Sequence, residues 1–341
     1  MKLQTALCFD DVLIKPKYSN ISSRKEIDIK TTLCDNLVLG IPIISSPMDT
    51  VTEAVMSIEI SRQGGMGIIH RYNTPGEQSA MVQDARASGA KNVGVAVGVG
   101  EDAVYRAKQC IESGANLICI DVAHGHHCLV EYTLKALRNT FGTAVHLMAG
   151  NVATAEAHEA LSDWGADSVR VGIGGGSICS TRIQTGHGMP TLQSVFDCAT
   201  RGGSATIIAD GGIRNSGDIV KCLAAGADAV MLGSLLAGTI ESPGEISHKE
   251  GKSIKVYRGM ASKDAQIEWR GHYSSDEGVT SYVKSQGPLS GVVDGLVRGI
   301  RSGLSYSGCR SISEFHQAAE LILQTPLGNV ESGTHILGKD K

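Results

Sequence analysis

Residues 205–234 read ATIIADGGIRNSGDIVKCLAAGADAVMLGS and contain one complete β-α-β unit. The runs ATIIADGG and AVMLGS are almost continuously apolar, which is typical of strands covered on both faces in a parallel sheet. Between them, SGDIVKCLAAGA has helical spacing and closes on Gly-Ala, a common helix C-cap. The stretch therefore predicts a strand, a helix and a second, parallel strand.

The same unit recurs along the chain. Six further apolar runs occupy 41–46, 65–70, 92–98, 117–122, 145–151 and 168–174. Helical stretches lie between them, among them 52–64, 101–115 and 154–166. Eight β-α units predict an α/β fold of the (β/α)8 barrel class, whose functional residues gather at the C-terminal ends of the strands. A doubly wound open sheet is the alternative, because the number of strands does not prove closure.

Three segments fall outside this repeat. We expect a single barrel domain over 1–341 with an N-terminal arm (1–39), a flap (252–287) and a C-terminal tail (310–341). The flap is polar and punctuated by glycine, and we expect it to be a loop that covers the site.

Composition and charge exclude several classes of partner. Charged residues make up 19% of the chain and the formal net charge is −4, so no basic surface is expected to attract nucleic acid or anionic lipid. No apolar run approaches membrane-spanning length, and the start MKLQTALCFDDVLIKPKYSN has no apolar signal region. Nine cysteines form no CxxC pair, which favours reduced thiols. We expect a cytoplasmic protein.

A set made mainly of polar residues and glycines follows the predicted strands. They are Ser45, Ser46, Met48, His70, Arg71, Asp121, His124, Asn151, the segment 174–181, the segment 210–212, Gly233 and Ser234. In a barrel these residues would share one mouth. The glycine turns after the seventh and eighth strands stand where barrels bind phosphate through backbone N–H groups. A phosphorylated small molecule is therefore the expected ligand.

The stretch RVGIGGGSICSTR (170–182) places three glycines just before Cys179. A glycine run is retained where backbone turns sharply or approaches a ligand closely, which favours a reactive thiol. The alternative is a plain turn beside a buried, inert cysteine. The histidines of DVAHGHH (121–127) lack the usual spacing of a zinc site, so we do not interpret them as metal ligands. Asp121 is interpreted either as an acceptor for a ligand or as a carboxylate that orders its loop.

Nine motifs occur in a characteristic order: FDDVLIKPK, PMDTVTE, GGMGIIHR, DVAHGH, AGNVAT, VGIGGGSICSTR, ADGGIR, GSLLAG and YRGMAS. With them the chain resembles the family of IMP dehydrogenases and GMP reductases over nearly its whole length. The resemblance implies a homotetramer of (β/α)8 barrels in which Cys179 attacks C2 of a purine nucleotide. It also implies a nicotinamide dinucleotide cofactor and, as in some relatives, activation by K⁺.

The resemblance also implies a set of site residues. The catalytic residues would be Cys179 as nucleophile and Thr181 with Glu277 as a proton relay. Substrate would contact Ser46, Met48, Ser177, Asp210, Gly211, Gly212, Gly233, Ser234, Tyr257, Gly259, Met260 and Gly278. The cofactor would contact Arg71, Asp121, Val122, Ala123, Ile173, Gly174, Ser305 and Tyr306, with Ser23 and Arg24 reaching it from a neighbouring subunit. K⁺ would lie at Gly174, Gly176, Cys179 and Arg182, near Glu331 of a neighbour.

The two branches of the family differ mainly in the flap. Dehydrogenases carry an adjacent Arg-Tyr pair that activates water, whereas here Arg270 and Tyr273 are separated and HYSSDEG (272–278) resembles the reductase flap, with Glu277 in place. Three further features resemble reductases: the arm around Ser23, the pair Val122-Ala123, and the short connection from 70 to 92. This connection has no room for inserted regulatory domains. SPMDTVTEA, GSLLAGTIESPGE, YRGM and ESGTHIL (331–337) resemble dehydrogenases. Arg71 stands where both branches usually have lysine. Gly175 stands where this loop usually has proline.

The sequence thus favours an NADPH-dependent GMP reductase. Its alternative is a compact, NAD-dependent IMP dehydrogenase that uses Arg270 as base. Two hypotheses of other kinds are a silent nucleotide-binding regulator and a flavin-dependent barrel oxidoreductase.

Overall fold

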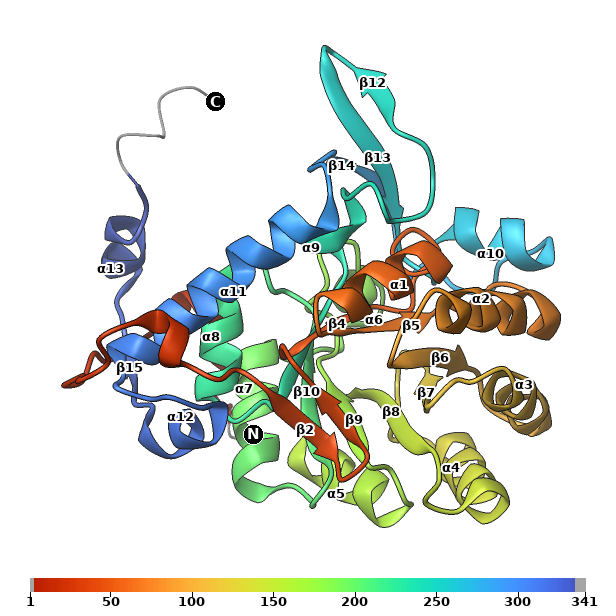
Figure 1. Cartoon of the computed structure of the whole chain (residues 1–341), viewed down its shortest axis with the longest axis horizontal. Helices are drawn as coiled ribbons and strands as arrows, with labels where there is room; N and C mark the ends of the chain where they lie inside the picture. Colours follow the sequence, from red (N-terminus) through yellow and green to blue (C-terminus); the bar gives the residue numbers. More distant parts are fainter. Residues whose placement is uncertain (1–2, 335–341) are drawn as a thin grey trace.

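A computed structural model describes residues 3–334 (Figure 1). Eight parallel strands form a closed barrel in the order β10-β11-β4-β5-β6-β7-β8-β9. They are β4 (Ile43–Ser45), β5 (Met66–Ile69), β6 (Val93–Val97), β7 (Leu117–Asp121), β8 (His146–Val152), β9 (Ser168–Val171), β10 (Thr206–Asp210) and β11 (Ala229–Leu232). Pairing of β11 with β4, with Leu232 opposite Ser45, closes the ring. The predicted (β/α)8 barrel is confirmed, and the open-sheet alternative is wrong.

Helices surround the strands. They are α1 (Ala54–Arg62), α2 (Pro75–Ala87), α3 (Glu101–Glu112), α4 (Cys128–Phe141), α5 (Ala155–Asp163), α7 (Thr191–Arg201), α8 (Ser216–Ala224) and α11 (Leu289–Tyr306). Two short helices, α6 (Thr181–Thr185) and α9 (Ser234–Ala237), follow β9 and β11 directly. Local capping chemistry sets the helix starts: Asn215 accepts from the backbone N–H of Asp218 at the start of α8.

The N-terminal arm closes the bottom of the barrel. Its hairpin, β2 (Thr31–Cys34) and β3 (Leu37–Leu39), places Leu33, Leu37 and Leu39 in one apolar cluster with the barrel-strand residues Ile44, Met66, Ile68, Ala96, Leu117, Cys119, Met148, Ile208, Ala229 and Met231. A second and larger cluster fills the space between strands and helices. Because apolar side chains fill the lower part of the ring, a ligand can enter only at the C-terminal ends of the strands.

The flap differs from the predicted loop. It contains the helix α10 (Lys263–Arg270) and two antiparallel strands, β13 (Lys252–Arg258) and β14 (Thr280–Lys284). On its other edge, β13 pairs with β12 (Ser247–Lys249). Figure 1 shows the β12–β13 hairpin standing away from the barrel and α10 at the upper right, above α2 in this view. The loop expectation was wrong because these strands are stabilised by pairing across the flap and carry mostly polar, exposed residues.

The two terminal segments lie together. The arm contributes η1 (Phe9–Asp11), β1 (Val12–Ile14) and η2 (Arg24–Glu26), and the C-terminal segment contributes α12 (Ile312–Ala318), β15 (Leu321–Leu323) and α13 (Pro326–Glu331). Strand β1 pairs antiparallel with β15. The last part of the expected tail, 335–341, lies outside the described residues, as does the end of ESGTHIL.

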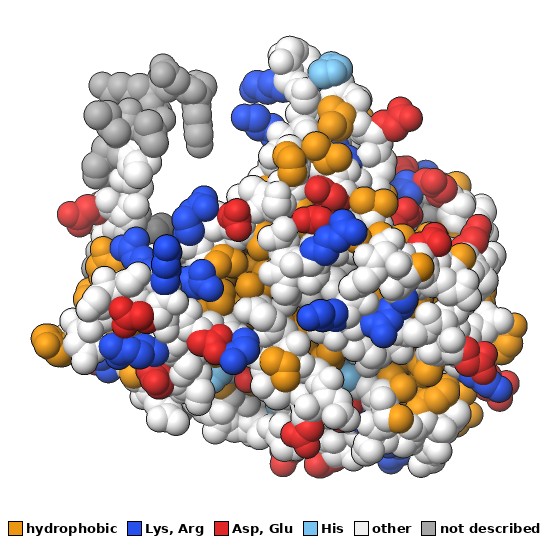
Figure 2. Space-filling model, in the orientation of Figure 1, with side chains coloured by type: hydrophobic (Ala, Val, Ile, Leu, Met, Phe, Trp, Pro, Cys, Tyr) orange, Lys and Arg blue, Asp and Glu red, His pale blue; other side chains and the backbone are white. Residues whose placement is uncertain are grey.

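The surface carries both signs of charge. On the face seen in Figure 2, Lys and Arg are interspersed with Asp and Glu rather than gathered in one field. Within residues 3–334, no helix combines the length and the apolar composition that crossing a membrane requires.

Candidate active site

A cavity of about 500 Å³ opens at the C-terminal end of the barrel. Six of the eight barrel strands contribute to it through the loops that follow them, and the flap covers it from one side. Its lining includes these predicted residues: Ser46, Met48, Arg71, Asp121, Val122, Ala123, Ile173, Gly174, Gly176, Ser177, Cys179, Thr181, Asp210, Gly211, Gly212, Gly233, Ser234, Tyr257, Gly259, Met260 and Glu277. The loops of a closed barrel therefore bring most of the predicted set into one pocket.

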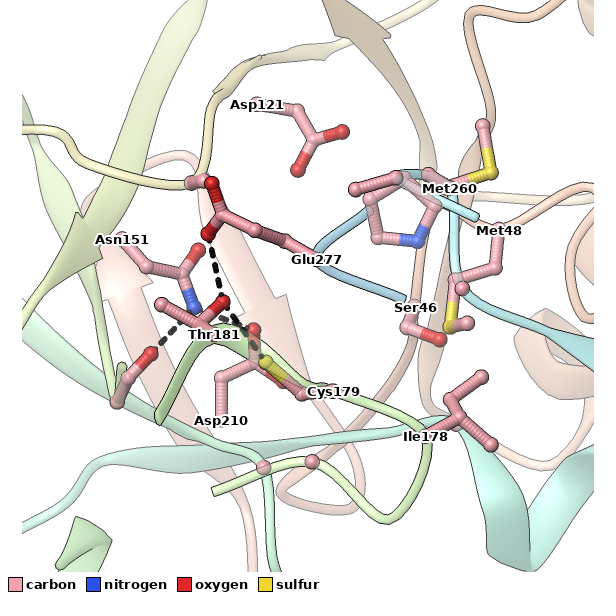
Figure 3. Close-up of a pocket in the computed structure, with 18 of the residues that line it drawn as sticks. Ser46, Met48, Asp121, Asn151, Ile178, Cys179, Thr181, Asp210, Met260 and Glu277 are labelled. Atoms are coloured by element: carbon pink, nitrogen blue, oxygen red, sulfur yellow. Dashed lines mark hydrogen bonds between the residues drawn. The ribbon is translucent and has the colours of Figure 1, made fainter. Parts of the chain in front are cut away.

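Cys179, Thr181 and Glu277 form a hydrogen-bonded chain in this pocket (Figure 3). The Cys179 thiol donates to Thr181 Oγ1 across 3.1 Å, and the Thr181 hydroxyl donates to Glu277 Oε2 across 2.9 Å. All three side chains are half-buried. Such a chain can carry a proton between the thiol and the carboxylate.

The flap reaches the cysteine loop through its backbone. The N–H of Ser180 donates to the carbonyl of Glu277 at 3.1 Å, and the N–H of Val279 donates to the carbonyl of Ile178 at 3.0 Å. Between them, Gly278 stands opposite Cys179 in a β-bridge. A Cβ at Gly278 would lie 2.9 Å from the Ser262 nitrogen, so glycine permits this close approach. Gly278 thus positions the loop without lining the cavity.

The turns after β10 and β11 form the opposite wall. Gly211 and Gly212 have φ of +93° and +78°, which glycine adopts without strain. At Gly233 a Cβ would lie 2.7 Å from the Tyr257 hydroxyl and 3.2 Å from Ser46 Oγ. Burial raises the pKa of Tyr257, so its hydroxyl remains a donor. Ser46 Oγ is buried and has no hydrogen-bond partner within residues 3–334, which leaves it available to a ligand.

Arg170 connects two carboxylates at the floor of the pocket. Its guanidinium lies 2.5 Å from Asp121 Oδ1 and 2.8 Å from Asp210 Oδ2, and only 6% of the residue is exposed. Burial opposes its charge, but the two carboxylates outweigh burial and raise the pKa of Arg170. Asn151 Nδ2 also donates to Asp210 Oδ2 at 2.8 Å. Asp121 is thus held by an ion pair and also lines the pocket, so its contact with a ligand stays a prediction.

The family model for the IMP dehydrogenase / GMP reductase domain matches residues 6–335. The chain belongs to the IMP dehydrogenase / GMP reductase family. It is therefore an oxidoreductase of purine nucleotide metabolism, and enzymes of this family use nicotinamide nucleotide cofactors.

Relatives of both branches resemble it. It is 33% identical to inosine-5'-monophosphate dehydrogenase of Nitrosopumilus maritimus, over 98% of this chain and 99% of that one. It is 32% identical to GMP reductase of Leishmania major, over 99% of this chain and 98% of that one. A crystal structure of a cysteine-to-alanine variant of Trypanosoma brucei GMP reductase, in complex with guanosine 5'-monophosphate, superposes with a TM-score of 0.92 at 32% identity, over 98% of each chain.

Some predicted residues of this family member lie away from the cavity. Ser23 caps η2, which packs on α11, while Ser305 and Tyr306 end α11. The Tyr306 carbonyl accepts from the N–H of Lys17 in the arm, so these residues cluster beside the arm. The arm also carries the predicted cofactor residue Arg24, the first residue of η2. Within one subunit none of the four lines the pocket.

Arg182 and the histidines of the DVAHGHH motif also lie outside the pocket. Arg182 borders a second cavity of about 250 Å³ and donates to the carbonyl of Met189. His127 accepts from the N–H of Leu129 and caps α4, whereas His126 lies against Trp164. Across the described residues, no three His, Cys, Asp or Glu side chains are grouped as metal ligands.

Sequence reasoning missed an aromatic pair at the pocket mouth. The rings of Tyr72, after β5, and Trp269, on α10, are stacked with centroids 4.2 Å apart. The guanidiniums of Arg71 and Arg270 lie within 6 Å of the Trp269 centroid, at 5.8 and 5.6 Å. The position of Tyr72 just after a strand was the only available signal, since its partner is nearly two hundred residues away in the chain.

Proposed function

We propose that the protein is an NADPH-dependent GMP reductase, which converts GMP to IMP and ammonia. The observation that carries this proposal is the chain from Cys179 through Thr181 to Glu277. It supplies a nucleophile and a carboxylate relay for a leaving amine in one pocket. A crystal structure of a GMP reductase with bound GMP has the same fold, which supports the proposal.

The first stage is the loss of ammonia. The Cys179 sulfur would add to C2 of the purine, while its proton passes through Thr181 towards Glu277. Glu277 would then return a proton through Thr181 to the amino group, because ammonia leaves more readily than an amide anion. The C2–N bond breaks and the purine stays attached to Cys179.

The second stage needs a hydride donor. NADPH would supply a hydride at C2, after which the C2–S bond breaks and IMP leaves the Cys179 thiolate. Arg71, Asp121, Val122, Ala123, Ile173 and Gly174 would hold this cofactor. They fit it because Arg71 Nε is buried and has no hydrogen-bond partner among the described residues, although it lies 3.8 Å from Asp121 Oδ2; its N–H can therefore still donate to a phosphate or amide oxygen.

The remaining contacts would hold GMP and assemble the enzyme. Ser46, Tyr257 and the N–H groups of the turns at 211–212 and 233–234 would bind ribose and phosphate. K⁺ would be held by the carbonyls of Gly174, Gly176 and Cys179. In a homotetramer, the cluster of Ser23, Arg24, Ser305 and Tyr306 would meet the cofactor of a neighbouring subunit.

The alternative is IMP dehydrogenase with Arg270 as base, since Arg270 lines the same pocket. Its Nη2 donates to Gln266 Oε1 and Ser274 Oγ, both at 2.6 Å, which holds the side chain within the flap. One assay separates the two functions: GMP with NADPH against IMP with NAD⁺, followed at the absorbance of reduced nicotinamide. NAD⁺-dependent turnover of IMP without GMP reduction would reject the reductase.

A further inference from the structure

The side chain of Gln266 joins two parts of the flap. It lies on α10 and only 2% of it is exposed. Its Nε2 donates to the carbonyl of Ser275 at 2.7 Å, and its Oε1 accepts from the N–H of Ser274 at 3.1 Å. Nε2 also donates to the carbonyl of Ala261 at 3.0 Å. Gln266 borders the cavity, but both the N–H and the oxygen of its amide already have hydrogen-bond partners within the flap. It therefore requires no ligand to complete its hydrogen bonds.

The helix that carries Gln266 is fastened to the barrel. Trp269 stacks on Tyr72, and the Tyr72 hydroxyl donates to the carbonyl of Met260 at 2.7 Å. Arg258 lies 2.6 Å from Glu268 on α10 and 2.6 Å from Asp49, which follows β4. The helix is thus held from the barrel by an aromatic stack and an ion-pair bridge.

The stretch held by Gln266 leads directly to Glu277. Ser275 Oγ accepts from the backbone N–H of Glu277 at 3.3 Å, two residues further along. The stretch from 271 to 278 contains no helix or strand. Backbone bonds to the cysteine loop hold its end at Glu277 and Gly278, and side-chain contacts of the kind made by Gln266 hold the part before it. The Glu277 carboxylate must meet Thr181 within hydrogen-bond distance, and it does so at 2.9 Å.

We propose that Gln266 is a positioning residue for the Glu277 carboxylate, and that it transmits the fixed position of α10 to the proton relay. This inference rests on the proposed function of Glu277. Glutamine offers both a donor and an acceptor at this reach, whereas methionine has no donor and only a weak acceptor, and an ionised glutamate cannot donate.

The test is a double-mutant cycle between Gln266→Met and Glu277→Gln in the full-length enzyme. In the native background, Gln266→Met should lower kcat by roughly 10²-fold and leave the KM for GMP within about threefold, since misplacing a catalytic group affects the chemical step. In the Glu277→Gln background, the same substitution should cost less than about twofold, because the carboxylate it positions is already gone. Equal losses in both backgrounds would show a general structural role and overturn the inference.

Two comparisons guard against a folding defect. Gln286→Met makes the same chemical change at the other end of the flap, where Gln286 Nε2 donates to the Leu235 carbonyl, and it should leave kcat within about twofold. Gln266→Glu keeps the acceptor for Ser274 and should lower kcat in the same way as Gln266→Met. A loss in Gln286→Met equal to that in Gln266→Met would overturn the inference.

A readout without turnover separates this inference from the proposed function. The rate at which iodoacetamide alkylates Cys179 can be followed by mass spectrometry. Gln266→Met and Glu277→Gln should change this rate by the same factor, and the double variant should change it no further. Different factors would overturn the inference. If these factors agree but GMP is not reduced, the proposed function fails and the positioning of Glu277 stands.

Discussion

Thr181 and Glu277 share a 2.9 Å hydrogen bond although 96 positions separate them in the chain. One residue begins α6 behind the cysteine loop, and the other belongs to the flap. The hydrogen-bonded chain from Cys179 to Glu277 is therefore complete only while the flap lies against the cysteine loop. If this chain is the proposed proton relay, flap residues should affect chemistry more than binding.

Glu277→Gln should lower GMP reduction by roughly 10²- to 10⁴-fold, because an amide cannot pass a proton to the leaving amine. Arg270→Ala should cost far less, since Arg270 contacts Gln266 and Ser274 rather than the relay. Steady-state kinetics with GMP and NADPH would measure both. The reverse ranking, together with NAD⁺-dependent formation of XMP from IMP, would place the enzyme in the dehydrogenase branch.

Cys179→Ala should abolish turnover and leave GMP affinity within roughly tenfold, because ribose and phosphate contacts carry ground-state binding while the thiol carries the chemistry. Calorimetric titration with GMP and an activity assay would test this. Residual turnover at a substantial fraction of the native rate would remove the covalent mechanism.

Potassium should accelerate the reaction relative to sodium if the carbonyls of Gly174, Gly176 and Cys179 form part of an oxygen cage. The measurement compares initial rates in the two chloride salts at matched ionic strength. Equal rates would mean that protein contacts alone hold the cysteine loop, including the 3.1 Å bond from the Cys179 N–H to the Gly176 carbonyl.

Gly233→Ala should raise the KM for the nucleotide by about tenfold with a smaller change in kcat, because the new methyl group would crowd the hydroxyls of Tyr257 and Ser46, which are proposed substrate contacts. Gly76→Ala is the matched control, since no atom lies within 4 Å of a Cβ there. An unchanged KM in Gly233→Ala would exclude this turn from nucleotide binding.

Stability should fall in mild acid because of His146. Burial lowers the pKa of His146 from 6.5 to about 4, and Nε2 lies 2.8 Å from Ser168 Oγ. The unfolded chain therefore takes up a proton before the folded one does. The stability that this neutral histidine contributes is complete above pH 6.5 and is lost as the pH falls from 6.5 towards 4. Between roughly pH 7 and 5, the free energy of unfolding should fall by about 2 kcal/mol.

Urea unfolding of the native protein and of His146→Gln at these two pH values would measure that contribution. The substitution should reduce the difference between the two pH values. If the native protein and the variant lose equal free energy of unfolding, His146 does not govern this pH dependence.

The barrel was predictable because each strand carries its own signal. A run such as LICIDV is apolar on both faces whatever its neighbours are, and the polar Asp121 at its end marks the mouth. The same logic located Asp210, whereas the glycine run before Cys179 drew attention to that thiol. Glu277 was found only through the family resemblance, since nothing local distinguishes it from other carboxylates.

The flap and its network were not predictable in this way. Strand β14 is mostly exposed, and its pairing with β13 depends on residues that lie more than twenty positions away. The roles of Gln266 and Trp269 depend on contacts with Ser275 and Tyr72, and neither residue type indicates its partner. Arg170 was missed because a charged residue inside an apolar run becomes intelligible only when Asp121 and Asp210 are placed around it.

The cavity proposed to bind the nucleotide lies over the seam at which the first and last barrel strands, β4 and β11, meet. The N–H of Ser46 donates to the Leu232 carbonyl at 3.0 Å, and Gly233 follows on the other side of that seam. A folding intermediate with an open ring would lack this wall and could not bind the nucleotide in the native way. Under the proposed function, nucleotide binding and ring closure would be thermodynamically linked, and each tenfold excess of nucleotide over its Kd would add about 1.4 kcal/mol in favour of the closed ring.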